Sequence, residues 1–270
     1  MNGVLGRSIV FLAKAGVVVN DRTVIDQLTG LSVDVNGLII PGRSIENVLA
    51  RHTFNLVVAN DDELFKVSLV GSATAVRYKG REILLTTQHQ VKGLDESRIA
   101  MLTDSGSHVI TSGGRRGYIP HPDTDAYDIV AFDFTEPCKE RFDLKKRFFE
   151  LRSAPPDTLN VYVLAMLLTG YPSADQKYEV HESNHLGIFR RQVMCLPDSQ
   201  PSDEALLTVR AQRPLEQQPD GMSGGSAFVV QWENGRPKAY FAGIIVRGGK
   251  ESFQILKAGF VVAFLDSALE

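Results

Sequence analysis

Short apolar runs rich in β-branched residues recur along the first half of the chain, with only a few turn residues between them. Parallel strands need long crossover connections, so this close spacing predicts antiparallel pairing. The predicted strands cover residues 56–59, 65–70, 73–78, 82–87, 99–102, 108–111 and 128–132, and the glycine-rich residues 113–117 are predicted to form a loop.

A second series of apolar runs follows after residue 158. Two series of similar size, each with about six strands, predict two packed antiparallel barrels in an all-β protein. The predicted strands of this half cover residues 159–168, 178–181, 187–195, 205–210, 227–232, 239–246 and 259–264.

Between the two series, Phe142, Leu144, Phe148 and Leu151 recur at roughly helical spacing among basic residues. This pattern predicts a short linker helix. Its basic residues could dock an acidic partner, but a solvated helix face is the favoured interpretation. The predicted units are an N-terminal extension (1–53), a first barrel (54–137), the linker helix (138–156) and a second barrel (157–270).

The N-terminal extension carries a hairpin signal. Asn36-Gly37 lies between β-branched residues and supplies the two positive φ angles of a type I′ turn. A short helix is predicted over residues 44–51, with Ser44 as its N-cap. Lys14 interrupts the early apolar run, which is then too short for a signal-peptide core, so a folded strand or helix is expected there.

Composition narrows the class of protein. The chain has 270 residues, 43% of them hydrophobic, and a formal net charge of -3, which is typical of a globular protein and gives no sign of a nucleic-acid surface. With two cysteines, Cys138 and Cys195, it can form at most one disulfide. This cysteine usage favours a cytoplasmic location. No cofactor, metal ion or membrane is expected as a partner.

The candidate chemistry centres on Gly221-Met222-Ser223-Gly224-Gly225. Glycines on both sides of a serine allow a substrate carbonyl to approach the hydroxyl while backbone N–H groups face the developing oxyanion. The competing interpretation is an ordinary Gly-Ser loop.

The order of residues along the chain separates two hydrolase folds. The pentapeptide also fits the nucleophile elbow of α/β-hydrolases, in which the histidine follows the serine. Here all six histidines precede Ser223: His52, His89, His108, His121, His181 and His185. The order His, Asp, Ser is instead that of chymotrypsin-like peptidases.

Four segments resemble the chymotrypsin-like (trypsin-like) serine peptidases, over about residues 54 to 266. They are the strand and turn ending in Thr87-Gln88-His89, the run from Asp128 to Phe132, the Ser223 loop, and the run from Gly243 to Gly248. The resemblance implies two β-barrels with the active site in the cleft between them. The few cysteines suggest an intracellular or bacterial-type member that lacks the usual disulfides.

The resemblance also implies a role for each candidate residue. Ser223 would be the nucleophile, His89 the general base and acid, and Asp128 the residue that orients the histidine. The N–H groups of Gly221 and Ser223 would form the oxyanion hole. Asp123 or Asp125 could take the place of Asp128.

Two departures from the family pattern predict how the site is kept active. Gln90 follows the histidine where extracellular members usually carry a cysteine. Met222 stands where members activated by proteolysis carry an aspartate that pairs with a newly freed N-terminus. Because methionine cannot form that ion pair, we expect activity without cleavage just ahead of Leu56.

The resemblance places the primary specificity pocket near Gln217, with Val246, Gly248 and Gly259 on its walls. A neutral Gln217 gives no reason to expect a strong preference for Lys or Arg at the cleavage site. The glycines predict a pocket open to sizeable side chains, and Arg247 or Lys257 could favour acidic ones.

The function predicted from the sequence is therefore that of a serine endopeptidase acting on a protein or peptide substrate. The alternatives are a catalytically silent module that binds a peptide or partner protein along residues 243–248, and an esterase with the same site. A regulatory partner protein is possible. The sequence does not indicate the oligomeric state.

Overall fold

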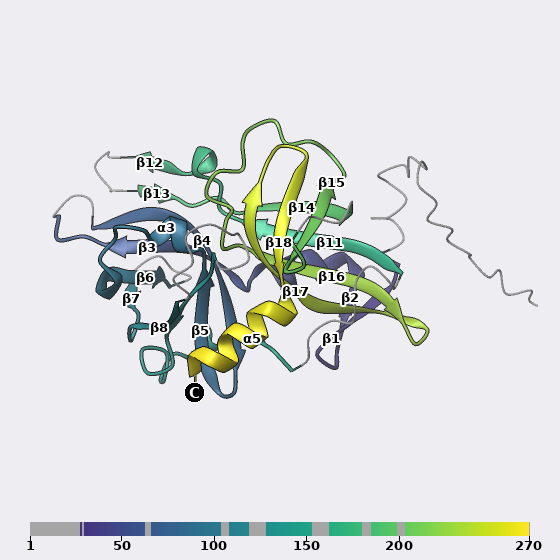
Figure 1. Ribbon diagram of the computed structural model, residues 1–270, viewed down its shortest axis with the longest axis horizontal. Helices are drawn as coiled ribbons and strands as arrows, with labels where there is room; N and C mark the ends of the chain where they lie inside the picture. Colours follow the sequence, from purple (N-terminus) through teal and green to yellow (C-terminus); the bar gives the residue numbers. More distant parts are fainter. Residues whose placement is uncertain are drawn as a thin grey trace, which may run out of the picture.

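The computed structural model describes residues 28, 30–62, 66–103, 108–118, 128–152, 162–179, 185–198 and 203–269. Two large β-sheets lie side by side and are covered at one side by a C-terminal helix (Figure 1). The predicted all-β class is confirmed, and the two mainly antiparallel sheets agree with the chymotrypsin-like arrangement expected from the sequence, although among the described residues only one of the two predicted barrels closes. The element expected before residue 20 lies outside the described residues.

The first sheet contains seven antiparallel strands in the order β7-β6-β3-β4-β5-β9-β8, and the two-residue strand β10 pairs in parallel with β4. The long strand β4 covers two segments predicted to be separate, and its pairing with β3 shifts register next to Gly71. The strands are β3 (Thr53–Ala59), β4 (Val67–Tyr78), β5 (Arg81–Thr86), β6 (Ile99–Leu102), β7 (Val109–Thr111), β8 (Arg115–Tyr118), β9 (Val130–Asp133) and β10 (Phe149–Glu150).

The second sheet closes into a six-stranded barrel in the order β16-β11-β14-β15-β18-β17, because β16 also pairs with β17. A separate ribbon of two short strands, β12 and β13, stands away from it (Figure 1). The strands are β11 (Val163–Gly170), β12 (Lys177–Glu179), β13 (His185–Gly187), β14 (Arg191–Pro197), β15 (Leu206–Ala211), β16 (Ser226–Glu233), β17 (Arg236–Gly248) and β18 (Ser252–Lys257).

The predicted N-terminal hairpin is confirmed as β1 (Ser32–Val35) and β2 (Leu38–Pro41), with φ angles of 52° at Asn36 and 85° at Gly37. Strand β1 pairs in parallel with β17, so the hairpin extends the second sheet. The short helix α2 (Ile45–Ala50) also forms as predicted, but the Ser44 side chain makes no capping hydrogen bond.

Short helical turns connect several of the strands. The α-helical turns are α3 (Gln88–Val91) and α4 (Phe142–Lys145), and 3-10 turns occur at η1 (Gly42–Ser44), η2 (Glu96–Arg98) and η4 (Ser173–Asp175). Of these, α3 directly follows β5 and carries His89, one of the candidate site residues.

Three apolar clusters hold the described residues together. One fills the first sheet around Phe54, Phe132 and Phe134, and another fills the barrel around Met166 and Phe253. The third joins the two sheets, because it combines residues of β4, β5 and β9 with residues of β16, β17 and the C-terminal helix. The relative position of the two sheets is therefore set by a continuous apolar contact.

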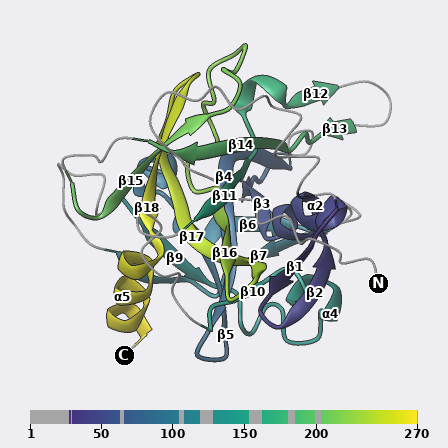
Figure 2. The same cartoon turned by 90° about the vertical axis from the view of Figure 1, so that its right-hand side faces the viewer.

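The predicted final strand, residues 259–264, is wrong: the chain forms helix α5 (Ala258–Leu269) there. Its buried residues, Ala258, Val261, Phe264 and Leu265, follow helical spacing and face the cluster between the sheets. Hydrogen bonding of Tyr78 to Asp266 at 2.7 Å ties the helix to β4 (Figure 2 shows the helix beside the C-terminus). Strand β18, which was not predicted, precedes this helix and pairs with β15 and β17.

Two further predictions are corrected. Over residues 138–152, the described part of the expected linker helix (138–156), the chain forms only the single α-helical turn α4, and β10 follows it. Phe148 packs inside the first sheet while Phe149 packs between the sheets, so these neighbours point in opposite directions, as in a strand. Residues expected to form a loop at 113–117 contribute to β8, which pairs with β9.

No helix in the described part of the chain is long and apolar enough to cross a membrane.

Candidate functional site

His89 and Asp128 form the best-defined polar pair of the site. The Asp128 carboxylate accepts hydrogen bonds from His89 Nδ1 at 2.5 Å and from the His89 backbone N–H at 3.1 Å. A proton on Nδ1 leaves Nε2 as the ring nitrogen that can accept a proton. The imidazole is 54% exposed, whereas the carboxylate is 16% exposed, so a partly buried acid orients an accessible base.

The chain brings this pair together at one end of two neighbouring strands. His89 lies in α3 just after β5, and Asp128 lies just before β9, which pairs with β5. The alternative acids Asp123 and Asp125 lie outside the described residues.

Ser223 lies on a tight loop that precedes β16 in the second sheet. Its neighbours Gly221 and Gly224 have φ angles of 93° and 78°, which other residues rarely adopt. A Cβ atom on Gly224 would lie 2.3 Å from the Ser72 carbonyl oxygen and 2.5 Å from Thr86 Oγ1. A glycine is therefore required at position 224, where the loop passes close to the first sheet.

The Ser223 hydroxyl donates to the Val246 carbonyl of β17, at 3.3 Å. Within the described part of the chain, Ser223 and His89 share no hydrogen bond. The residue after the histidine nevertheless reaches the serine directly, since Gln90 Nε2 donates to the Ser223 carbonyl at 2.7 Å. The histidine-bearing turn and the candidate nucleophile are thus neighbours across the contact between the sheets.

The peptide groups of the loop are oriented so that two N–H groups stay available. The Asp220 carbonyl accepts from Ser173 N at 2.7 Å, and the Met222 carbonyl accepts from Gly225 N at 2.9 Å. In a trans peptide the N–H points away from the carbonyl, so these bonds also fix the N–H directions of Gly221 and Ser223. Neither of these two N–H groups donates a hydrogen bond among the described residues. Both can therefore serve as oxyanion donors.

Met222 anchors the loop by burial. Its side chain is 1% exposed and belongs to the apolar cluster inside the barrel, where it lies against Gly170. An apolar anchor thus occupies the position at which, from the resemblance in sequence, members activated by proteolysis were expected to carry a charged residue.

The predicted specificity residues are only partly brought together. Val246 is buried and contacts Ser223, and Gly248 follows it on the same strand, as does the exposed Arg247. Gln217 is exposed and does not form the floor of a buried pocket. Gly259 lies in α5 and not on the wall of this pocket. Strand β18 pairs antiparallel with β17, with Phe253 opposite Gly248 and Lys257 opposite Gly243. The chain therefore moves away from Gly248 before it reaches Gly259.

A large ring occupies the space that the sequence predicted to be open. A Cβ atom on Gly248 would lie 2.6 Å from Cδ1 of Phe253, a ring that is 1% exposed, and 3.1 Å from Cγ of Pro219. The expectation of an open pocket beside Gly248 is therefore wrong, because Phe253 fills this space.

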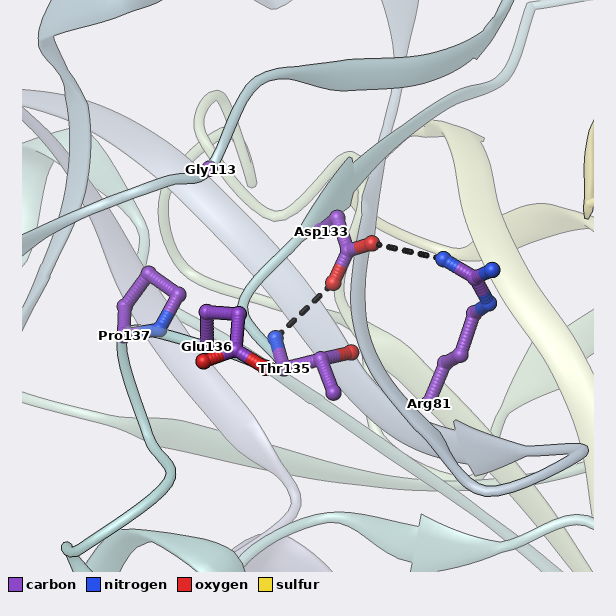
Figure 3. A pocket seen from close by; sticks show the side chains of 6 residues that line it. All are labelled: Arg81, Gly113, Asp133, Thr135, Glu136 and Pro137. Atoms are coloured by element: carbon purple, nitrogen blue, oxygen red, sulfur yellow. Dashed lines mark hydrogen bonds and ion pairs between the residues drawn. The ribbon is translucent and has the colours of Figure 1, made fainter.

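A separate pocket of about 430 Å³ lies at the opposite end of β5 from His89. Figure 3 shows Asp133 inside it, where the carboxylate accepts from Arg81 Nη1 at 3.2 Å and from Thr135 N at 2.8 Å. Each carboxylate oxygen of Asp133 thus accepts a hydrogen bond from a group of the protein. Gly113, Glu136 and Pro137 complete the wall.

The two cysteines are unpaired and buried in different apolar clusters, and burial raises the pKa of each thiol to about 12. Neither thiol is therefore suited to act as a nucleophile. Among the described residues, no three His, Cys, Asp or Glu side chains are grouped so as to hold a metal ion.

Three further residues of the site were not predicted from the sequence. Ser72 and Thr74 of β4, together with Gln90, each donate a side-chain hydrogen bond to a carbonyl of the Ser223 loop. Gln90 was noted only as a replacement for a cysteine. Ser72 and Thr74 have no sequence signal, because their role depends on contact with a loop about 150 residues away.

No family model and no curated protein matches the chain. A solved structure that is similar is the scabies mite inactivated protease paralogue S-D1, with 13% sequence identity and a TM-score of 0.49. The match covers 82% of this chain and 94% of that one. A similarity at this level does not bear on whether this chain is active.

Proposed function

We propose that this protein is a serine endopeptidase in which His89, Asp128 and Ser223 form a catalytic triad. The observation that carries the proposal is the contact of Gln90 with the Ser223 carbonyl at 2.7 Å, which joins the histidine-bearing turn to the serine loop. The Asp128 carboxylate on the other side of the imidazole supports the same assignment. The proposed substrate is a protein or peptide.

The proposed reaction begins when the Ser223 hydroxyl turns from Val246 toward His89 Nε2. Catalytic hydrogen bonds of this kind often form only when substrate is bound. His89 would take the hydroxyl proton as Ser223 Oγ attacks the scissile carbonyl, and the oxyanion would accept from the Gly221 and Ser223 N–H groups. His89 would then protonate the leaving amine, and water would hydrolyse the acyl-enzyme.

Proteolytic activation is not part of the proposal. Strand β3 runs without a break from Thr53 to Ala59, and Phe54 within it is 2% exposed. A cut just ahead of Leu56 would divide a strand that pairs with both β4 and β6. Because the buried Met222 already anchors the loop, full-length protein is proposed to be the active form.

One observation favours a second function. The Ser223 hydroxyl is engaged by the Val246 carbonyl, as it could remain in a catalytically silent module. Pairing of β16 with β17 begins at Ser226, opposite Ile244, so the last residues of β17 extend beyond the start of β16. A bound peptide could pair with the edge that follows Ile245 in either function.

Hydrolysis of a denatured protein mixture separates the two functions. Full-length wild type and Ser223→Ala would be incubated with the mixture, and new peptide termini would be identified by mass spectrometry. The endopeptidase predicts termini that appear with wild type and are absent with Ser223→Ala. Peptide capture by both proteins without new termini would overturn the proposed activity and support the silent module.

A further inference from the structure

Every carbonyl of the Ser223 loop from Asp220 to Gly224 accepts a hydrogen bond, and the donors fall into two groups. Main-chain N–H groups donate to the carbonyls of Asp220 and Met222. These carbonyls belong to the two peptides whose N–H groups, on Gly221 and Ser223, are the candidate oxyanion donors. Side chains of the first sheet hold the other three. Ser72 Oγ binds the Gly221 carbonyl at 2.6 Å, Gln90 Nε2 binds that of Ser223 at 2.7 Å, and Thr74 Oγ1 binds that of Gly224 at 2.8 Å.

These three side chains, here called the loop clamp, connect the two sheets at the candidate active site. The proposed base lies on the first sheet and the proposed nucleophile on the second, so their separation depends on how the sheets are held together. A displacement of about 1 Å at a reacting group can lower the rate about a hundredfold. The loop clamp therefore helps to set the distance between His89 and Ser223.

Gln90 has a special position in the clamp because it directly follows His89. Its Nε2 is directed at the Ser223 carbonyl, and its Oε1 lies 3.0 Å from Thr86 Oγ1, whose single proton is shared between this oxygen and the Ser72 carbonyl at 2.9 Å. A Cβ atom on Gly71 would lie 2.5 Å from Nε2, so a larger residue there would displace the amide. Contacts with Thr86, Gly71 and Ser223 therefore restrict the position of the amide.

We propose that Gln90 is a positioning residue for the proposed acyl transfer: its amide holds the Ser223 carbonyl at a fixed place relative to His89. The proposal rests on the proposed function. Gln90 acts through Ser223 and His89 and touches no reacting atom.

The test compares Gln90→Glu with Gln90→Met by their rates of labelling with a fluorophosphonate probe. The ionised carboxylate introduced by Gln90→Glu would have nearly the shape of the amide but no proton to donate to the Ser223 carbonyl, whereas a protonated carboxyl could donate one. At about pH 8 both variants are expected to label at least about tenfold more slowly than wild type.

The pH dependence distinguishes positioning from simple packing. Each variant's rate is divided by the wild-type rate measured at the same pH. As pH falls toward about 5, burial should protonate the new carboxyl, and the Gln90→Glu ratio should rise while the Gln90→Met ratio stays constant. Wild-type rates in both variants, or equal losses that do not change with pH, would overturn the proposal.

Gln192 provides a matched control, since its Nε2 also donates to a backbone carbonyl, that of Glu46 at 2.8 Å, away from the loop. Gln192→Glu and Gln192→Met are expected to label at the wild-type rate. A loss in these variants equal to that in the Gln90 variants would overturn the proposal.

Hydrogen exchange separates failure of this inference from failure of the proposed function. The Gly224 N–H is bonded to the Ile245 carbonyl at 2.7 Å and the Gly225 N–H to that of Met222, so both should exchange slowly. Gln90→Met should speed their exchange, and Gln192→Met should not. If wild type fails to label, the proposed activity is overturned, while unchanged exchange in Gln90→Met would show independently that Gln90 does not hold the loop.

Discussion

The two halves of the candidate site are held in different ways. On the second sheet, Ser223 lies in a loop whose Gly224 fits closely against the first sheet and whose carbonyls from Asp220 to Gly224 all accept hydrogen bonds. On the first sheet, the His89 ring is 54% exposed and is hydrogen-bonded only to Asp128 within the described residues. The nucleophile side is thus fixed by many contacts, and the base side by one carboxylate.

This difference predicts how substitutions in each half of the site change activity and stability. A loop held by many contacts loses only part of its order when one contact is removed. A base held by one carboxylate loses its tautomer and orientation together. Substitutions at the base side should therefore lower activity with little change in stability, and substitutions in the loop should affect both.

Asp128→Asn is expected to have the largest effect on activity. The asparagine amide can direct an N–H toward His89 Nδ1 and so favour the wrong tautomer, and the corresponding change in a chymotrypsin-like triad lowers kcat about 10⁴-fold. Peptide hydrolysis measures kcat, and thermal unfolding should show a Tm close to that of wild type. A loss below about tenfold would contradict Asp128 as the orienting acid, and Asp123→Asn and Asp125→Asn would then identify the residue that replaces it.

Gly224→Ala is expected to lower stability and activity together. The added Cβ would overlap the Ser72 carbonyl oxygen at 2.3 Å, and a φ of 78° is itself unfavourable for alanine. Gly235→Ala is a matched control, because Gly235 has a φ of 80° with no atom within 4 Å of the added Cβ.

Urea unfolding gives the free energy of unfolding of both variants. The backbone conformation alone costs about 1–3 kcal/mol at each position, and the overlap at Gly224 should add about 1–3 kcal/mol more. Only Gly224→Ala should also slow fluorophosphonate labelling. Equal stability losses in the two variants would show that the loop is not closely fitted to the first sheet.

A second histidine allows a contrast with the exposed His89. His52 is 3% exposed, its Nδ1 donates to the Arg147 carbonyl at 2.7 Å, and its ring packs edge-on against Phe149 and near Phe228 of the second sheet. Burial, aided by the nearby Arg51 and Arg147 charges, lowers the pKa of His52 from 6.5 to about 3.

The lowered pKa of His52 predicts a pH-dependent loss of stability. Between about pH 6.5 and pH 3 the unfolded chain binds a proton that the folded chain does not, so stability falls as pH falls, by up to about 1.4 kcal/mol per pH unit. His52→Asn keeps an N–H donor without this titration. Urea unfolding at several pH values should show a steeper loss for wild type, and parallel curves would contradict a neutral, buried His52.

The sequence predicted the parts of the fold that have local signals. Asn36-Gly37 specified its hairpin through two positive φ angles, and most strands were found from their apolar pattern. The C-terminal helix was mistaken for a strand because Val261 and Val262 give a β-like run, while the helical spacing becomes clear only when Leu265 is included.

The rest depended on contacts between distant segments. Phe148 and Phe149 are consecutive yet face different apolar clusters, which a helical pattern in the sequence concealed. The same limit applies to the site. His89 and Asp128 were predicted as a pair and the structure brings them together, whereas Phe253 beside Gly248 and the loop clamp arise only from packing across the sheets.

The most direct test of the central claim is labelling of full-length protein with a fluorophosphonate, followed by mapping of the modified residue in wild type and in His89→Ala. The account predicts a single adduct on Ser223 in wild type, formed at least about 10³-fold more slowly without His89. No labelling of folded wild type, or equally fast labelling in His89→Ala, would contradict a serine activated by this histidine.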